Sequence, residues 1–204
     1  MTSANTNRKQ CAGIILAAGV ASRFGAPKAL VDWYGKPLIT KLTETMLEAG
    51  LQPVVVVVGA YSVQIRQALQ EFPITLVDND TWQLGMLSSL QTGISALPDD
   101  ASGFVMALGD HPYLEKAIID CLTDAMTNGD VVIPIYQGKR GHPVLWNCSA
   151  FSTILNLDAS KTPRDVLALL KVHEVPWQNR FILEDMDTPG DYRRLLIEMR
   201  DSIE

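Results

Sequence analysis

Cysteine and histidine are scarce in this chain. There are three of each among 204 residues, and Cys11, Cys121 and Cys148 lie far apart without a CxxC pair. An odd and scattered set of cysteines fits neither a disulfide framework nor a zinc cluster. We therefore expect reduced, structural thiols and a cytoplasmic location.

Long apolar runs and excess positive charge are also missing. No run approaches the roughly 18 apolar residues of a membrane-spanning helix. Arg8 and Lys9 precede an apolar run, as in a secretory signal, but the run from Cys11 to Ala18 is short for one. Asp and Glu outnumber Lys and Arg by 23 to 17, for a net charge of −6. Since this field repels polyanions, we expect neither a nucleic-acid nor a membrane partner.

Short apolar runs alternate with amphipathic stretches along most of the chain. Residues 1–10 are polar, and we expect a flexible tail there. The runs lack polar alternation, as is typical of parallel strands covered on both faces. They are GIILAA (13–18), VVVVV (54–58), ITLV (74–77), FVMAL (104–108) and VVIPI (131–135). Helical spacing lies between them, and a last helix is predicted from about Pro189.

This alternation predicts one domain over residues 11–204 with an α/β fold. The expected architecture is a three-layer, doubly wound, mostly parallel and Rossmann-like sheet. Ligands of such sheets bind beyond the carboxyl ends of the strands, so the loops after Ala18, Val77, Leu108 and Ile135 form the expected rim of a site. Residues 136–179 are less regular, and we interpret them as an elaboration on the substrate side.

Small residues and two cations follow Ala18. A loop containing Gly19 and Gly25 lets backbone N–H groups approach phosphate oxygens, and Arg23 and Lys28 add positive charge. The stretch is neither a Walker loop, which ends in GK[ST], nor a GxGxxG dinucleotide loop. Spacing alone leaves two interpretations open, a phosphate site and an ordinary glycine-containing turn.

The same stretch, LAAGVASRFGAPK (16–28), resembles the LAAGxSxRxGxxK signature of the MobA-like NTP transferases. These are Rossmann-like nucleotidyltransferases of the GT-A type, and the molybdenum cofactor cytidylyltransferases are the most similar members. Further segments follow in family order: DWYGKPLI, NDTWQLGMLSSLQTG, LGDHP, GKRGHPVL and DMDTPGDY. The resemblance implies transfer of a nucleoside monophosphate from an NTP to a phosphorylated acceptor, with release of pyrophosphate.

Two aspartates are the candidate metal ligands. Asp110, directly after the run 104–108, is placed to hold Mg²⁺ through hard oxygen atoms, with Mn²⁺ as the alternative ion. An aspartate that caps the next helix is the structural alternative. The resemblance points to Asp187 as the second ligand, whereas Asp191 would complement the dipole of the last helix.

The nucleotide is expected to bind along the first loop and the segment NDTWQLGMLSSLQTG. The resemblance assigns it to the four residues Leu16, Ala17, Ala18 and Gly19. Gly85 would permit close approach of a base, and Ser88 or Ser89 would hydrogen-bond the base edge. Trp82 is either a stacking platform or a core residue.

The LAAG version of the first loop accompanies cytidylyl transfer in this family, and LAGG accompanies guanylyl transfer. The resemblance therefore implies CTP, with the methyl group of Ala18 crowding a purine. In GKRGHPVLW, it assigns acceptor recognition to Arg140, Gly141 and His142, with an ordinary charged hairpin turn as the alternative. The segment LDASKTPRDVL departs from the GDxGAR-like segment common in cytidylyltransferases. The acceptor therefore stays open between molybdopterin and a sugar or alditol phosphate.

The predicted reaction is an in-line displacement. An acceptor phosphate oxygen attacks the α-phosphorus of CTP, while Arg23, Lys28 and the ion held by Asp110 stabilise the developing charge. A phosphate nucleophile is already ionised, so neither His111 nor His142 is assigned as a general base. A molybdenum hydroxylase that receives the finished cofactor is a partner implied by the resemblance. The alternative from another functional class is a non-catalytic protein that binds nucleotide or cofactor.

Overall fold

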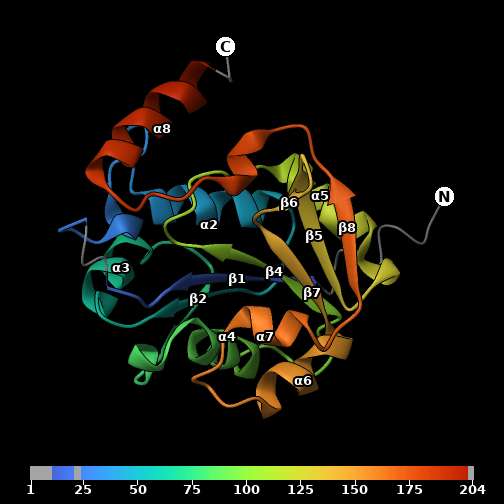
Figure 1. The fold of residues 1–204 in the computed structure, drawn as a ribbon. Coiled ribbons are helices and arrows are strands. Elements are labelled where there is room, and N and C mark those ends of the chain that lie inside the picture. The colour runs from blue at the N-terminus through green and yellow to red at the C-terminus, as the bar shows by residue number, and fades with distance from the viewer. Residues whose placement is uncertain (1–10, 21–23, 202–204) are drawn as a thin grey trace.

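The computed structural model describes residues 11–20 and 24–201. The predicted tail, residues 1–10, and the predicted site residue Arg23 lie outside the described residues. The strands are β1 (Cys11–Ala17), β2 (Val54–Val58), β3 (Thr75–Asp78), β4 (Gly103–Leu108), β5 (Val131–Tyr136), β6 (Lys139–Arg140), β7 (Val144–Asn147) and β8 (Val172–Pro176). All eight belong to one sheet, shown in Figure 1.

Helices lie between the strands and after the last one. The α-helices are α2 (Leu38–Glu48), α3 (Ser62–Ala68), α4 (Met86–Ser95), α5 (Lys116–Asp124), α6 (Phe151–Asn156), α7 (Pro163–Leu167) and α8 (Pro189–Asp201). Short 3₁₀ helices are η1 (Lys28–Leu30), η2 (Trp82–Leu84), η3 (Met126–Asn128), η4 (Cys148–Ala150) and η5 (Arg180–Leu183). In the part of the chain that the structure describes, no helix is long and apolar enough to cross a membrane.

The first half of the sheet is parallel. Its strands run in the order β3, β2, β1, β4, and each pair is parallel. Fully buried aliphatic residues make up β1 and β2, as the uninterrupted apolar runs predict. The prediction that the run 74–77 is covered on both faces holds only in part, because Leu76 and Val77 pack partly buried against opposite clusters whereas Thr75 and Asp78 are exposed. Among the described strands, β3 pairs with β2 alone. It is an edge strand.

The second half of the sheet is mixed. β7 lies between β4 and β5 and is antiparallel to both. Along one edge, residues 131–135 of β5 pair with β8. The other edge of β5 pairs with β7 at Val131 and with β6 at Ile135, so β6 and β7 lie on the same side of β5. Residues 139–147 are therefore one arm of a hairpin with β5, interrupted at Gly141–Pro143. The interpretation of residues 136–179 as an irregular elaboration is wrong here, because β7 is a buried strand inside the sheet.

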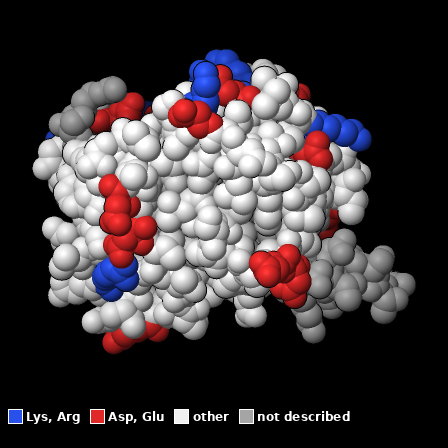
Figure 2. Space-filling view, turned by 90° about the horizontal axis from the view of Figure 1, so that it is seen from below, with Lys and Arg blue, Asp and Glu red and all other residues white. Residues whose placement is uncertain are grey.

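Two apolar clusters cover the two faces of the sheet. Alternate residues of β1 divide between them, with Ile15 on one side and Ile14 on the other. Helices α2, α5 and α8 pack with the first cluster, and α4, α6 and α7 lie on the opposite face (Figure 1). Seen from below, the side of α4, α6 and α7, the surface is mostly uncharged (Figure 2). The three-layer, mostly parallel α/β fold predicted from the sequence is confirmed.

Candidate active site

The site lies where β1 and β4 end. These strands are parallel neighbours, so the residues that follow them emerge at one edge of the sheet. The amide of Gly109 donates to the carbonyl of Leu16 over 2.9 Å, and the amide of Ala60 donates to the carbonyl of Ala18 over 3.1 Å. These backbone bonds hold the loop after β1 against the ends of its neighbours. Asp110 follows directly on this edge.

A cavity of about 400 Å³ opens at this edge. It is lined by predicted and unpredicted residues, namely Leu16, Ala17, Ala18, Gly19, Val20, Pro27, Lys28, Ala29, Tyr61, Ile65, Trp82, Gln83, Gly85, Met86, Ser89, Leu108, Gly109 and Asp110. One part of the wall carries the charges of Lys28 and Asp110, whereas Val20, Trp82 and Met86 are apolar. Such a cavity suits a ligand with a charged part and a flat apolar part.

Lys28 joins the two predicted metal ligands. Its Nζ donates to Oδ2 of Asp110 over 3.1 Å and to Oδ1 of Asp187 over 2.8 Å. The Lys28 side chain is 14% exposed, against 36% for Asp110 and 47% for Asp187. The carboxylates are 77 positions apart in the sequence yet share one ammonium group. An aspartate that only caps a helix would not explain this arrangement.

Negative charge is concentrated around these carboxylates. Burial lowers the pKa of Lys28, but its hydrogen bonds and charge interactions with Asp187 and Asp110 outweigh burial, so the pKa is raised. Burial, followed by the charges of Asp187 and Asp110, raises the pKa of Asp185. Each neighbouring carboxylate disfavours ionisation of another. The site therefore favours a cation, a need that the Lys28 ammonium meets in part.

Asp187 is brought to this place by tertiary contacts. Met186 is fully buried, and its amide donates to the carbonyl of Asp110 over 3.1 Å. This bond links the two ligand segments directly, so Asp185 and Asp187 flank an anchored residue. Among the described residues, no group of three or more His, Cys, Asp or Glu side chains is arranged to hold a metal. Two carboxylates suit an ion whose coordination is completed by phosphate oxygens and water.

The segment after β3 is organised by Asn79, a residue that sequence analysis missed. Its Nδ2 donates to Oγ of Ser88 over 2.9 Å and to Oγ of Ser89 over 3.0 Å. Ser88 also donates to backbone carbonyls of this loop, whereas Ser89 lines the cavity. Ser88 therefore shapes the loop, and of the two serines only Ser89 reaches the cavity wall. Asn79 directly follows a strand, the one signal that could have identified it.

Trp82 begins η2 in this loop, and Gly85 follows η2 directly. Gly85 has φ of 120° and ψ of −171°, a conformation reserved for glycine, and it is the N-cap of α4. Apart from its chain neighbours, no atom of the part that the structure describes lies within 4 Å of where its Cβ would be, so the backbone there is open to a ligand. Trp82 packs partly against the core and lines the cavity as well. The core interpretation of this tryptophan is therefore confirmed in part, and its role as a stacking platform stays a prediction.

The predicted acceptor residues divide into two groups. Arg140 pairs with Glu174 on β8, with its Nε 2.7 Å from Oε1. Gln137 and Gly138 both have positive φ, which gives the tight hairpin turn that was the alternative for this segment. Gly141 and His142 instead contact η5, because the His142 amide donates to the carbonyl of Ile182 over 2.8 Å.

His142 lies beside the metal-ligand candidates. Its ring centroid is 4.9 Å from that of His111, which follows Asp110. Burial lowers the pKa of His111 to about 4. Burial, and then the neighbouring His111, lowers the pKa of His142 to about 3. Both imidazoles are neutral at neutral pH, so the positive charge of this loop is on Lys139 and Arg140 alone.

Known proteins are similar in sequence to most of this chain. Residues 13–175 match the family described as MobA-like NTP transferase domain. Nicotine blue oxidoreductase of Paenarthrobacter nicotinovorans is 29% identical over 90% of this chain and 95% of its own length. Molybdenum cofactor cytidylyltransferase of Escherichia coli is 24% identical over 88% and 92%. A probable molybdenum cofactor guanylyltransferase of Bacillus mycoides is 30% identical over 64% of each chain.

Solved structures show the same fold. Rv0371c of Mycobacterium tuberculosis superposes with a TM-score of 0.80 at 24% identity, covering 92% of this chain and 98% of its own. The family match covers more than half of the sequence, including the loop after β1 and Asp110. The chain belongs to the MobA-like NTP transferase family.

Proposed function

We propose that this protein transfers CMP from CTP to a phosphorylated acceptor, most simply molybdopterin, and releases pyrophosphate. The observation that carries the proposal is the bridge from Lys28 to both Asp110 and Asp187 beside the cavity. A triphosphate brings negative charge to the reacting centre, and catalysis there consists mostly of positioning and charge stabilisation. The Lys28 ammonium group and the paired carboxylates of Asp110 and Asp187 are suited to positioning a triphosphate and to stabilising its charge.

The carboxylates fit a divalent cation. Asp110 and Asp187 would hold Mg²⁺ or Mn²⁺, because both provide hard oxygen ligands and already share a cationic partner. When bound, the ion neutralises charge on the triphosphate and on the leaving pyrophosphate. A second structure of the mycobacterial neighbour is described as a complex with manganese. At 24% identity that neighbour supports the fold, and metal dependence of this chain is part of the proposal.

The chain's own residues orient the reaction. Among the described residues, and apart from chain neighbours, a Cβ at Gly19 or Gly85 would meet no atom within 4 Å, so the backbone there admits a nucleotide closely. Lys28 supplies positive charge to the triphosphate. An acceptor phosphate oxygen forms the new bond to the α-phosphorus, and the bond from that phosphorus to the β-phosphate oxygen breaks, so pyrophosphate leaves with the electron pair. The phosphate nucleophile needs no general base.

The preference for CTP depends on Ala18. Ala18 is almost fully buried, lines the cavity and packs against Gly59, where a Cβ would come within 2.6 Å of the Ala18 carbonyl oxygen. This tight packing leaves the loop little freedom to retreat from a larger base. The loop sequence LAAG supports CTP, as does the cytidylyltransferase relative. Guanylyltransferase relatives make GTP the competing choice.

The decisive experiment offers the purified protein each of the four NTPs with Mg²⁺ and molybdopterin, a sugar phosphate or an alditol phosphate, and measures pyrophosphate. We expect release that requires both CTP and molybdopterin. Release with GTP alone would refute the base assignment, and release with another acceptor would refute the pterin assignment. No release with any pair, despite nucleotide binding, would favour the non-catalytic alternative.

The relative named nicotine blue oxidoreductase makes this measurement necessary. It is similar over 90% of this chain, yet its name describes a different reaction class. Family membership alone therefore does not determine the reaction. The Asp110–Lys28–Asp187 arrangement favours phosphoryl chemistry, because paired carboxylates suit a divalent cation and an ammonium group suits a triphosphate.

A further inference from the structure

The segment that carries Asp187 has no regular secondary structure of its own. Residues 184–188, here called the ligand segment, connect η5 to α8. Met186 anchors its inner side through burial and through the amide bond to Asp110. Asp187 itself is 47% exposed, so packing does little to orient its carboxylate. Beyond the bond from Lys28 to Asp187, a second set of contacts holds the outer side of the segment.

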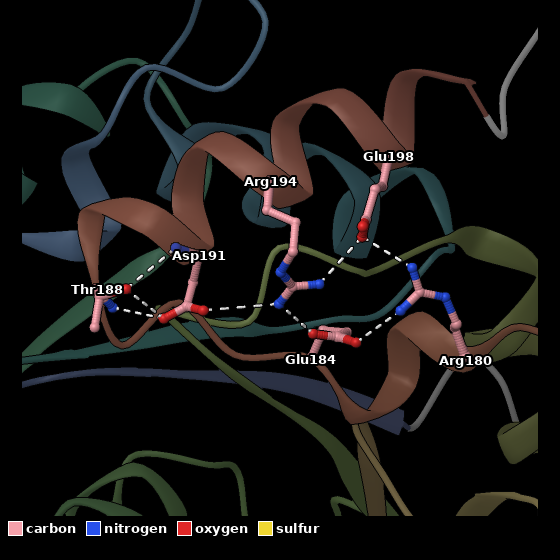
Figure 3. Close-up of polar contacts among 6 residues, drawn as sticks. All are labelled: Arg180, Glu184, Thr188, Asp191, Arg194 and Glu198. Atoms are coloured by element: carbon pink, nitrogen blue, oxygen red, sulfur yellow. Dashed lines mark hydrogen bonds and ion pairs between the residues drawn. The ribbon is translucent and has the colours of Figure 1, made fainter.

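Arg194 of α8 supplies contacts at both ends of the ligand segment. Its Nη2 lies 2.7 Å from Oε2 of Glu184, where the segment begins. The same nitrogen lies 3.8 Å from Oδ1 of Asp191, just beyond the end of the segment. Figure 3 shows the guanidinium between these two carboxylates. One rigid group therefore ties together the residues that flank Asp187.

Asp191, which contacts Arg194, also binds Thr188, the residue directly after Asp187. Its Oδ2 accepts from the backbone amide of Thr188 over 2.9 Å and from the Thr188 hydroxyl over 2.7 Å. The Asp191 amide donates back to the Thr188 hydroxyl over 3.2 Å, which completes a capping box. Fixing Thr188 in this way fixes the chain direction immediately after Asp187. The role of Asp191 is thus wider than the dipole interaction predicted from sequence.

Glu198 also holds the guanidinium of Arg194, and Arg180 contacts both glutamates that bind it. Nη1 of Arg194 lies 3.1 Å from Oε2 of Glu198, one turn along α8. Arg180 of η5 contacts Glu184 over 2.9 Å and Glu198 over 2.8 Å (Figure 3). Two arginines and two glutamates thus join η5 to α8 across the ligand segment. Partly exposed ion pairs contribute little to global stability, so stability alone is a weak reason for this network.

We propose that Arg194 is a positioning residue that holds Asp187 beside Asp110 and Lys28. The inference rests on the proposed function, since it concerns the metal ligation assigned to Asp187. Arg194 suits the role because its planar fork engages separate carboxylates at fixed angles, which a lysine ammonium cannot do. Arg194 contacts neither substrate nor metal in this role. It acts through Glu184, Asp191 and Thr188.

The test compares Arg194→Ala with wild type and with the control Lys116→Ala. Lys116 forms an exposed pair with Asp120 over 2.6 Å within α5, and it joins no separate segments. Mn²⁺ binding in the presence of CTP is measured by electron paramagnetic resonance of the free ion. We expect Arg194→Ala to raise the dissociation constant about fivefold, and Lys116→Ala to leave it unchanged.

Kinetics provide a second readout that a merely structural role would not move. In Arg194→Ala, the metal concentration for half-maximal pyrophosphate release should rise about fivefold, with kcat at saturating metal within about twofold of wild type. Arg194→Lys keeps the charge but not the fork, so we expect recovery of only part of the loss. Melting temperatures of all variants show whether the fold is intact.

Unchanged Mn²⁺ binding in folded Arg194→Ala would overturn the inference. So would a lower kcat at saturating metal with unchanged metal dependence. If wild type releases no pyrophosphate with any NTP, the proposed function fails, but the binding measurement still decides the inference. The two failures are therefore distinguishable.

Discussion

The two halves of the sheet present site residues in different ways. In the parallel half, β1 to β4, the site residues follow directly from the ends of buried strands, and Ala18 and Asp110 are examples. In the mixed half, β5 to β8, Gly141, His142 and Asp187 lie on irregular segments. Backbone hydrogen bonds to Ile182 and Asp110 fix those segments. Strand ends thus form the side predicted to bind nucleotide, and long-range contacts form the opposite side.

The largest expected effect comes from Asp110, where the two halves meet. We expect Asp110→Asn to lower metal-dependent pyrophosphate release by at least about 100-fold, because it removes a charge from the metal site. Lys28 keeps its bond to Asp187, so the fold should persist. Circular dichroism and the melting temperature provide the control. Activity within twofold of wild type would remove Asp110 from the site.

A glycine pair compares the rigidity of the halves. A Cβ at Gly141 would come within 2.4 Å of the backbone oxygen of Ile182, whereas a Cβ at Gly19 has no described atom within 4 Å beyond its chain neighbours. Gly141→Ala should therefore cost about 1–3 kcal/mol of the free energy of unfolding. The melting temperature should fall by about 2–4 °C per kcal/mol. Gly19→Ala should melt like wild type, and equal melting of both variants would mean that the 141–143 segment is not tightly held.

The preference for one nucleotide base tests a residue of the parallel half, Ala18, which follows β1 and lines the cavity. Ala18→Gly removes the methyl group that is expected to crowd a purine, and we expect the ratio of kcat/KM for GTP to that for CTP to rise about tenfold. Ser149→Ala, on η4 outside the cavity lining, serves as a control and should leave the ratio unchanged. An unchanged ratio in Ala18→Gly would place base selection elsewhere along the cavity.

The smallest expected effect concerns thiol reactivity. It compares the buried Cys11 of the parallel half with the exposed Cys148 of the mixed half. Burial in β1 raises the pKa of Cys11 to about 12, so it stays a protonated thiol at pH 8. Cys148 in η4 is exposed. With Ellman's reagent at pH 8, we expect Cys148 to react at once and Cys11 only after unfolding. Cys148→Ser should abolish the fast phase, and rapid reaction of Cys11 in the native protein would contradict the packing of β1.

Local patterns predicted the parallel half well. The uninterrupted apolar runs correctly indicated β1, β2 and β4, because strands covered on both faces need no polar alternation. The short antiparallel β7 was missed, since the prediction relied on strands alternating with helices. Ser88 was assigned to the base edge, but its hydroxyl bonds to Asn79 and to backbone carbonyls of the loop. Whether the Ser88 hydroxyl faces a ligand or bonds within the loop depends on the conformation of the folded loop, which no local pattern predicts.

The sequence by itself determined the α/β class, the loop after β1 and the position of Asp110 at a strand end, because each follows from residues close together in the chain. Resemblance to a family, not spacing, pointed to Asp187. Only the tertiary structure brought Asp187 to Lys28, which lies 159 positions away. It also decided that the amide of the buried Met186 bonds to the Asp110 carbonyl, and that Arg194 contacts Glu184 and Asp191 on either side of Asp187 in the chain. Side chains so far apart in sequence meet only after the sheet and its helices have packed, so no local pattern encodes the contact.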